Sequence, residues 1–308
     1  ILDQDGKVVE EWVSKKEPHV VYALEPGEYV LHEEQAPTEQ GYVRAEDVKF
    51  VVEETGDVQK VKMEDDHTKV SISKTDITDG KEIEGAKLQI LNQDGEVVES
   101  WTTGEEHLIE YIPVGTYTLH EEAAIDGYIV ANDVEFTVEE TGEIQKVKME
   151  DERAMGQLVI VKTDTDSKTA LEGVEFVLLE KETGEEVGRL KTGKDGKAVS
   201  ELLPIGTYEN GVFKEPITYV LKETATLKGY EKTEEEWEIV FTYQNDKTPV
   251  IEVVKEIQNK KIPETPGTVK PGPKTGDDTN WFLPLLALGV SAGMVAGLLY
   301  YRKRHKKA

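Results

Sequence analysis

Short runs of alternating apolar and polar residues fill most of the chain up to about residue 261. Val134, Phe136 and Val138 are separated by single polar residues, as are Trp237 and Ile239. A period of two residues is typical of strands with one buried face. Turn signals separate the strands, at Asp5-Gly6, Asp94-Gly95 and Asp195-Gly196. Long helical periodicity is absent from this part of the sequence, so the pattern predicts an all-β fold.

The strand pattern repeats along the chain. The segment Gln59–Asp65 recurs without change as Gln145–Asp151, and Ile1–Glu10 recurs in similar form as Ile90–Glu99. These matches define repeat one (1–67, without its first strand), repeat two (68–152) and a diverged repeat three (153–261). Units of this size, built from many short strands, predict tandem small antiparallel β-sandwiches with an immunoglobulin-like or prealbumin-like Greek key.

The last part of the chain has a different composition. Residues 262–280 are rich in Pro, Gly and Thr and predict an extended linker. Residues 281–301 form an apolar run without charges, which is long enough for one transmembrane helix. Residues 302–308 are mainly basic and would stay in the cytoplasm, which places the repeats outside the cell.

Charge and cysteine content exclude several classes of function. The 308 residues include 63 acidic and 36 basic side chains, a net charge of −27, which argues against nucleic acid as a partner. The absence of cysteine excludes disulfides, thiol nucleophiles and Cys-ligated zinc. The six histidines show no metal-binding spacing, so we expect neither a metal nor a cofactor. The chain begins with Ile1 and shows no export signal, and we therefore expect it to be the C-terminal fragment of a longer protein.

Three charged residues of repeat two share strand faces with apolar neighbours, namely Lys74, Glu121 and Asp151. Because side chains alternate across a strand, all three are expected to point into the core. A buried charge is costly unless it is paired or neutralised. Three such residues in one small sandwich are therefore expected to meet. The alternative is that the lysine extends outward from a strand end and forms an ordinary ion pair.

Repeat three has the same arrangement, with Lys162, Glu223 and Asn259 at the corresponding places. Lys255 has the same strand parity as Asn259 and would also point inward from a regular strand. A β-bulge is therefore predicted in the last strand of this repeat.

These residues resemble the Cna B-type (SpaA-like, prealbumin-like) domains of Gram-positive surface proteins. The resemblance covers residues 1–261, and its most specific mark is a Tyr-x-Leu-x-Glu element followed by Gly-Tyr, at Tyr29…Gly41-Tyr42, Tyr117…Gly127-Tyr128 and Tyr219…Gly229-Tyr230. It implies self-formed isopeptide bonds between Lys74 and Asp151 with Glu121 assisting, and between Lys162 and Asn259 with Glu223 assisting. Repeat one keeps Glu33 and Asp65, but the matching lysine would lie before Ile1.

The tail is similar to the cell-wall sorting signals that sortases cleave. The pentapeptide would be Gly272-Pro273-Lys274-Thr275-Gly276, cleaved between Thr275 and Gly276. Gly272 replaces the usual Leu of the Leu-Pro-x-Thr-Gly pattern, which leaves the sortase class open. The implied partners are a sortase, an amine acceptor on peptidoglycan or a pilin, and the membrane through residues 281–301 before cleavage. An ordinary single-pass anchor is the alternative.

The sequence as a whole predicts the stalk and anchor of an adhesin on the cell wall of a Gram-positive bacterium. The repeats would be stiffened by single-turnover cross-linking, and the chain would not be a turnover enzyme. Two alternatives remain: a minor pilin at the tip or base of a fibre, or the spacer of a wall-anchored enzyme whose catalytic domain lies upstream. The host or matrix ligand is left open.

Overall fold

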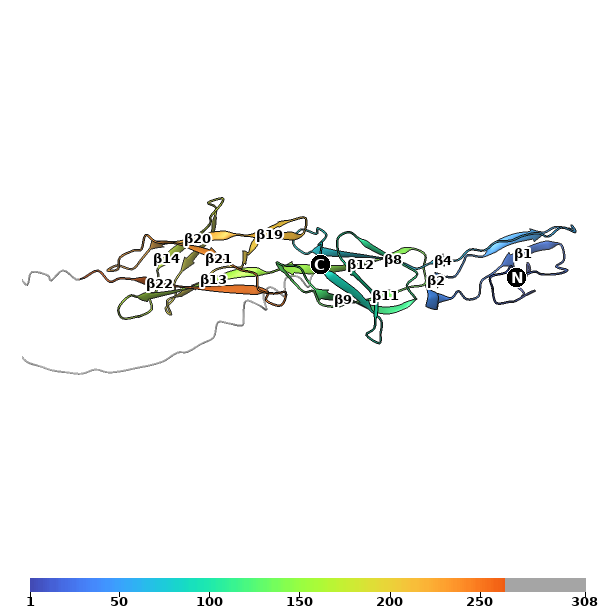
Figure 1. Cartoon of the computed structure of the whole chain (residues 1–308), viewed down its shortest axis with the longest axis horizontal. Coiled ribbons are helices and arrows are strands. Elements are labelled where there is room, and N and C mark those ends of the chain that lie inside the picture. Colours follow the sequence, from blue (N-terminus) through green and yellow to red (C-terminus); the bar gives the residue numbers. More distant parts are fainter. Residues whose placement is uncertain (264–308) are drawn as a thin grey trace, which may run out of the picture. The chain divides into compact units, whose positions relative to one another are not determined.

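The computed structural model describes residues 1–263, which form β-strands joined by turns and loops (Figure 1). Within this range the only helix is a single 3₁₀ turn, η1 (Thr38–Gln40). The prediction of an all-β fold is confirmed for these residues. Predicted strands appear where the alternation placed them, at β11 (Val134–Val138) and β21 (Glu236–Val240).

Repeat two is a sandwich of two four-stranded sheets. One sheet has the order β10-β12-β5-β8 and the other β11-β9-β6-β7. Its remaining strands are β5 (Lys69–Asp76), β6 (Lys87–Leu91), β7 (Val97–Thr102), β8 (His107–Glu110), β9 (Gly115–Ala123), β10 (Tyr128–Ile129) and β12 (Ile144–Arg153). The apolar faces enclose a core that includes Val70, Ile72, Leu88, Leu119 and Met149. Burial of these side chains is the main stabilising contribution to the repeat.

Repeat three has the same two layers and one additional hairpin. In one sheet β13 lies between β16 and β22 and also pairs with β17, and the other sheet has the order β15-β14-β20-β21. The strands β18 and β19 pair with each other. The bounds are β13 (Met155–Asp164), β14 (Glu175–Glu180), β15 (Glu186–Lys191), β16 (Lys197–Val199), β17 (Leu203–Pro204), β18 (Gly206–Glu209), β19 (Val212–Pro216), β20 (Thr218–Ala225) and β22 (Val250–Asn259).

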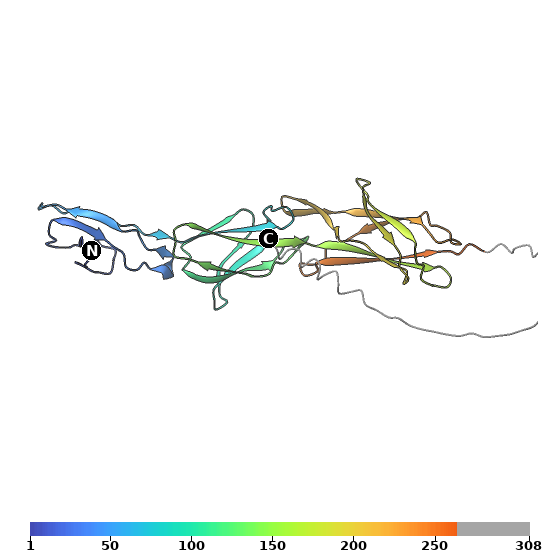
Figure 2. The ribbon, with the colours of Figure 1, turned by 180° about the vertical axis from the view of Figure 1, so that it is seen from behind.

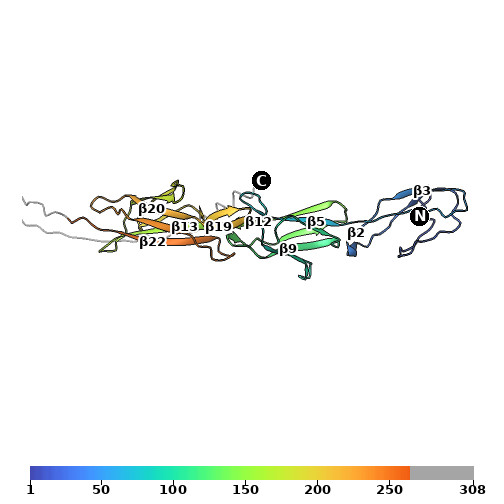
Figure 3. The same ribbon diagram turned by 45° about the horizontal axis from the view of Figure 1, so that its top comes forward.

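The first and last strands of these two repeats run in parallel, which corrects the prediction of purely antiparallel sandwiches. β12 pairs with β5 over eight residues, and β22 pairs with β13 over ten. Figure 1 and Figure 3 both show β22 alongside β13. The strand alternation could not reveal this direction, because a period of two residues is the same in parallel and antiparallel pairs. The parallel pair places the first and last strands of each repeat side by side, with the two ends of the repeat at opposite ends of the pair.

Repeat one contains fewer and shorter strands (Figure 2). The strands form two separate pairs, β1 with β3 and β2 with β4. Their bounds are β1 (Gly27–Leu31), β2 (Tyr42–Val43), β3 (Val48–Val52) and β4 (Asp66–His67). Residues 53–65 contain no strand, although they match the segment of repeat two that leads into β12 and forms most of it.

The predicted linker and tail lie largely beyond the described part of the chain. The sorting motif at 272–276, the apolar run at 281–301 and the basic end at 302–308 are all outside it. Within residues 1–263 no helix is long and apolar enough to span a membrane.

Candidate functional site

Two strands of one sheet and one strand of the facing sheet position the three predicted residues of repeat two. Lys74 is on β5 and Asp151 on β12, while Glu121 is on β9 across the core. In the parallel register Asp151 lies opposite Asp76, two residues beyond Lys74 on the same face. A lysine side chain is long enough to reach such a diagonal neighbour. The register therefore brings the amine to the carboxyl group of the last strand.

The three side chains of repeat two are in direct contact and almost completely buried. Lys74 and Glu121 are each 2% exposed, and Asp151 is 0% exposed. The Nζ of Lys74 contacts Asp151 Oδ1 and lies 2.9 Å from Glu121 Oε2. The backbone N–H of Ala131 donates a hydrogen bond of 2.6 Å to the same Glu121 oxygen. Lys74 is therefore not exposed at a strand end, and the contact joins the first strand of the repeat to the last.

The surroundings of Asp151 favour its protonated form. Burial raises its pKa from the ordinary value of 3.8 to about 7, the attraction of Lys74 opposes the rise, and the neighbouring Glu121 reinforces it. Among the described residues, Glu121 Oε1 and Asp151 Oδ2 have no hydrogen-bond partner. Two adjacent buried carboxylates repel each other, and each has one oxygen without a hydrogen-bond partner in the described part of the chain. A proton held between them would remove the repulsion and supply a hydrogen bond. A pKa of about 7 leaves a substantial fraction of Asp151 as the carboxylic acid at neutral pH, beside the amine of Lys74.

Repeat three repeats the geometry with an amide in place of the acid. The Nζ of Lys162 lies 2.5 Å from Asn259 Oδ1 and 3.0 Å from Glu223 Oε2. The Nδ2 of Asn259 donates to Glu223 Oε1 at 2.6 Å and to Thr226 Oγ1 at 2.7 Å. The parallel register again places the last-strand residue, Asn259, opposite Asp164, two residues beyond the lysine. The carbonyl of the amide faces the amine, and both of its N–H groups are bound.

Burial also prepares the amine of repeat three. Lys162 is 0% exposed, and this burial lowers its pKa, while the neighbouring Glu223 acts in the opposite direction. The ammonium position lies 5.9 Å from the centre of the Phe176 ring. A lowered pKa increases the fraction of neutral amine, which is the nucleophilic form.

The predicted bulge in the last strand of repeat three is wrong. β22 pairs with β13 in an unbroken register from Val250 to Asn259. Lys255 does share a face with Asn259, but it is only half-buried and its Nζ lies 5.8 Å from the centre of the Trp237 ring. A long side chain can cover an aromatic ring and still keep its charge near solvent, so the strand needs no irregularity.

Repeat one holds only the glutamate of the same three-residue site. The Ala45 N–H donates a hydrogen bond of 2.8 Å to Glu33 Oε2, which reproduces the contact of Ala131 with Glu121. Asp65, in contrast, is exposed and lies outside any strand. Within residues 1–67 no lysine occupies the position that Lys74 has in repeat two.

The comparison with protein families finds one model that matches three segments of the chain. The SpaA model, described as a prealbumin-like fold domain, matches residues 1–67, 68–153 and 156–215, which together exceed half of the chain. The chain belongs to the SpaA family of prealbumin-like fold domains. The search of curated proteins finds no significant match to this chain.

Solved structures with similarity to this SpaA-family chain include a Bacillus protein and two pilins. The Bacillus anthracis TIE protein is 30% identical with a TM-score of 0.49; the match covers 77% of this chain and 43% of that one. A streptococcal ancillary pilin is 19% identical with a TM-score of 0.30, covering 78% and 77%. The minor pilin GBS52 from Streptococcus agalactiae is 20% identical with a TM-score of 0.28, covering 68% and 100%. The chain thus spans less than half the length of the Bacillus protein.

Sequence reasoning missed two contacts of the SpaA-family sites. One is the backbone N–H of Ala131, for which a sequence gives no signal. The other is Thr226, which hydrogen-bonds the acceptor amide of repeat three. A signal for Thr226 was present, because it stands three residues after Glu223, where repeat two has Ala124 three residues after Glu121.

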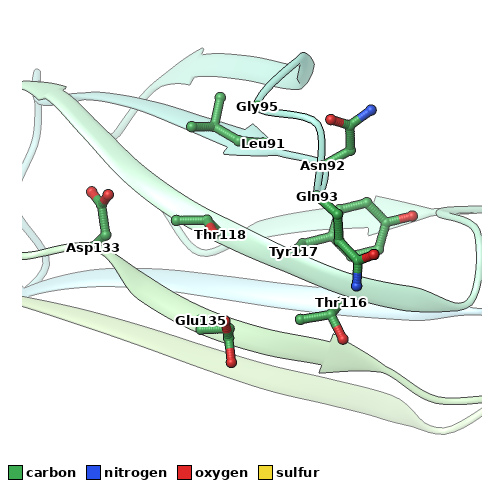
Figure 4. A pocket seen from close by; sticks show the side chains of 9 residues that line it. All are labelled: Leu91, Asn92, Gln93, Gly95, Thr116, Tyr117, Thr118, Asp133 and Glu135. Atoms are coloured by element: carbon green, nitrogen blue, oxygen red, sulfur yellow. The ribbon is translucent and has the colours of Figure 1, made fainter.

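Other features of the described residues offer no comparable chemistry. A hollow over β9 and β11 is lined mainly by polar side chains such as Asn92, Asp133 and Glu135 (Figure 4). Its lining includes neither Lys74 nor its two partners. Within residues 1–263, no group of three His, Asp or Glu side chains is placed to hold a metal ion.

Proposed function

We propose that this chain is the load-bearing stalk and anchor of a bacterial surface protein, and that repeats two and three each close one intramolecular isopeptide bond. The observation that carries the proposal is the buried contact of a first-strand lysine with a last-strand acid or amide. It occurs twice, each time with a glutamate against the amine. A buried polar cluster of this kind is costly as a purely structural element, which favours a chemical role.

The proposed reaction balances without any cofactor. In repeat two, the neutral amine of Lys74 attacks Cγ of protonated Asp151; a C–N bond forms, a C–O bond breaks and water leaves. In repeat three, Lys162 attacks Cγ of Asn259, and ammonia leaves. Glu121 or Glu223 accepts a proton from the attacking nitrogen and returns it to the leaving group, and is unchanged at the end. Fixed alignment of the partners replaces an activated acyl group, since intramolecular reactions reach effective molarities of about 10⁵–10⁸ M.

The bond positions explain what the cross-link would contribute. The lysine and its acceptor are 77 residues apart in repeat two and 97 in repeat three. Closing loops of that length lowers the entropy of the unfolded chain, worth about 4.5 kcal/mol in each repeat at 25 °C. A force applied along the chain enters on β5, crosses the bond and leaves on β12. The residues between the two strands are bypassed, so the repeat would not extend.

The anchoring part of the proposal rests on the sequence of the tail. A Pro-Lys-Thr-Gly segment, an apolar run and a basic end follow one another in the order of a sorting signal. A sortase would cleave between Thr275 and Gly276 and transfer the Thr275 carbonyl to an amine of the wall or of a pilin. The test is incubation of the chain with sortases of different classes and an aminated probe. A probe-linked product ending at Thr275, absent for Thr275→Ala, is expected. Intact chain with every sortase would exclude sortase anchoring.

The cross-links are tested by the peptides that the protein yields. Trypsin digestion of the recombinant 308-residue chain should give branched peptides in which Lys74 is joined to Asp151 and Lys162 to Asn259. Each should be lighter than the sum of its two arms, by one water and one ammonia respectively. Recovery of only linear peptides containing free Lys74 and Lys162 would contradict the proposal.

On intact bacteria, a ladder of covalent polymers in wall extracts would identify the chain as a pilin, whereas a single wall-linked species supports a stalk.

A further inference from the structure

The acceptor of repeat three has a hydrogen-bond partner that repeat two does not have. Nδ2 of Asn259 carries two N–H groups: one binds Glu223 Oε1 at 2.6 Å and the other binds Thr226 Oγ1 at 2.7 Å. Nδ2 is the atom that would depart as ammonia. Thr226 therefore contacts the leaving group directly.

The corresponding position differs in step with the acceptor along the chain. Three residues after the glutamate, repeat three has Thr226 with Asn259, and repeat two has Ala124 with Asp151. Repeat one has Ala36 three residues after Glu33, and the residue that matches Asp151 in its sequence is again an acid, Asp65. A hydroxyl thus accompanies the amide, and a methyl group accompanies each acid.

Physical chemistry gives a reason for this pairing. An amide nitrogen presents two donors, and the carboxylate of Glu223 takes only one of them in this geometry. A buried donor without a partner loses the free energy of its hydrogen bonds to water. A carboxylic acid has no second donor to satisfy. In repeat two Oδ2 of Asp151 has no hydrogen-bond partner among the described residues, and burial together with Glu121 raises the pKa of this acid, so the methyl group of Ala124 leaves no amide donor unpaired.

We propose that Thr226 is the leaving-group residue of repeat three, and that the residue three places after the glutamate determines whether an asparagine or an aspartate reacts efficiently. This inference rests on the proposed isopeptide bonds. Thr226 accepts one N–H of Asn259 before and during the reaction, so the nitrogen turns its developing lone pair toward the protonated Glu223. The proton then passes from Glu223 to Nδ2, the Cγ–Nδ2 bond breaks, and ammonia leaves beside the Thr226 hydroxyl.

The test follows bond formation in the 308-residue chain with time. The chain is isolated from inclusion bodies in denaturant, so that it starts unfolded. It is then refolded, and samples taken at successive times are digested. The branched peptides of both repeats are quantified by mass. The rate of bond formation in repeat two serves as an internal reference in every sample. Thr226→Val removes the acceptor at nearly constant volume, and Thr226→Ser keeps it.

Thr226→Val should slow the loss of ammonia at Lys162–Asn259 by about tenfold or more, the effect of one unpaired buried donor. The loss of water at Lys74–Asp151 should be unchanged in the same molecules. Thr226→Ser should restore the wild-type rate. In the Asn259→Asp background, which reproduces the pairing of repeat two, Thr226→Val should leave the loss of water unaffected.

The reciprocal exchange in repeat two provides a second measurement. Asp151→Asn should react slowly beside Ala124, and the double variant Ala124→Thr/Asp151→Asn should react faster than the single one. An unchanged rate of ammonia loss in Thr226→Val would overturn the inference. Equal slowing by Thr226→Val with and without the Asn259→Asp change would also overturn it, since it would indicate a purely structural role. Failure of the proposed cross-links is distinguishable, because no branched peptide would then form from either repeat of the wild-type chain.

Discussion

The same seven residues have different structures in repeats one and two. Gln145–Asp151 forms most of β12 and places Asp151 in the core at 0% exposure. The identical segment Gln59–Asp65 forms no strand, and Asp65 is exposed. The difference lies in the neighbour: β12 pairs in parallel with β5, and residues 59–65 have no such partner within the described chain. A last strand of this fold therefore depends on the first strand more than on its own sequence.

The glutamate part of the site behaves in the opposite way. Glu33 binds the Ala45 N–H in repeat one just as Glu121 binds the Ala131 N–H in repeat two. Glu33 follows the end of β1 by two residues and Glu121 lies on β9, and both strands belong to local antiparallel pairs, β1 with β3 and β9 with β11. Local pairing is thus sufficient to position the glutamate of the site. The amine and the acceptor require a contact between residues that are far apart in the sequence.

Mechanical extension should show the largest difference between repeat one and the other two repeats. In single-molecule pulling, repeats two and three should stay closed at forces that extend repeat one, because the proposed cross-links would carry the load. The variant Glu121→Gln, which lacks the proton-transferring acid, should release a length of about 260 Å, from 77 residues at about 3.4 Å each. Extension of wild-type repeat two by that length would contradict the load path.

Supplying the missing neighbour should convert repeat one into a copy of repeat two. A second copy of residues 68–89, placed directly before Ile1, restores a Lys-bearing first strand at the spacing found in repeat two. We expect residues 58–67 to form a strand and the chain to lose one further water, detected as a branched peptide containing Asp65. A control in which the added segment carries Lys74→Ala should still pair with residues 58–67, but no further water should be lost. No protection of residues 58–67 from hydrogen exchange in either version would show that the partner does not explain the difference.

Loss of the cross-link should lower the stability of repeat two by about 4.5 kcal/mol, the loop-closure value. The change is Glu121→Gln, and the readout is hydrogen exchange of peptides from β9 in the refolded chain. The matched control is Glu33→Gln, which affects the same backbone contact in a repeat without a cross-link. That change should cost only about 1 kcal/mol. Equal losses for the two substitutions would mean that Glu121 contributes only its hydrogen bonds.

The pH of refolding should distinguish the acid from the amide. Burial raises the pKa of Asp151 to about 7, so its reactive protonated form predominates below that pH and declines about tenfold per unit above it. Asn259 has no such ionisation. The ratio of the rate of water loss in repeat two to that of ammonia loss in repeat three should therefore fall as the pH rises from about 6 to about 9. The Asp151→Asn variant should remove the fall, and a constant ratio in the wild-type chain would contradict the protonated-acid reaction.

Strand parity was sufficient to predict which side chains point inward, because alternation is a local property of a strand. It correctly placed Lys74, Glu121 and Asp151 on core-facing positions. The parallel direction of β5 and β12 was not predictable, since it depends on how the whole chain folds back. The error at Lys255 has a similar origin: parity defines a face, but not whether a long side chain ends in the core or reaches solvent. The sequence shows that Thr226 replaces the alanine of repeat two, but its contact with Asn259 required coordinates, because the two residues are 33 positions apart.

The intact mass of the refolded 308-residue chain, measured alongside Glu121→Gln and Glu223→Gln, tests directly whether both cross-links form. If they form, the wild-type mass should be lower than the sequence mass by one water and one ammonia. Glu121→Gln should regain the water, Glu223→Gln should regain the ammonia, and the double variant should have the full sequence mass. A folded wild-type chain with the full sequence mass would contradict the account and leave buried ion pairs in place of covalent cross-links.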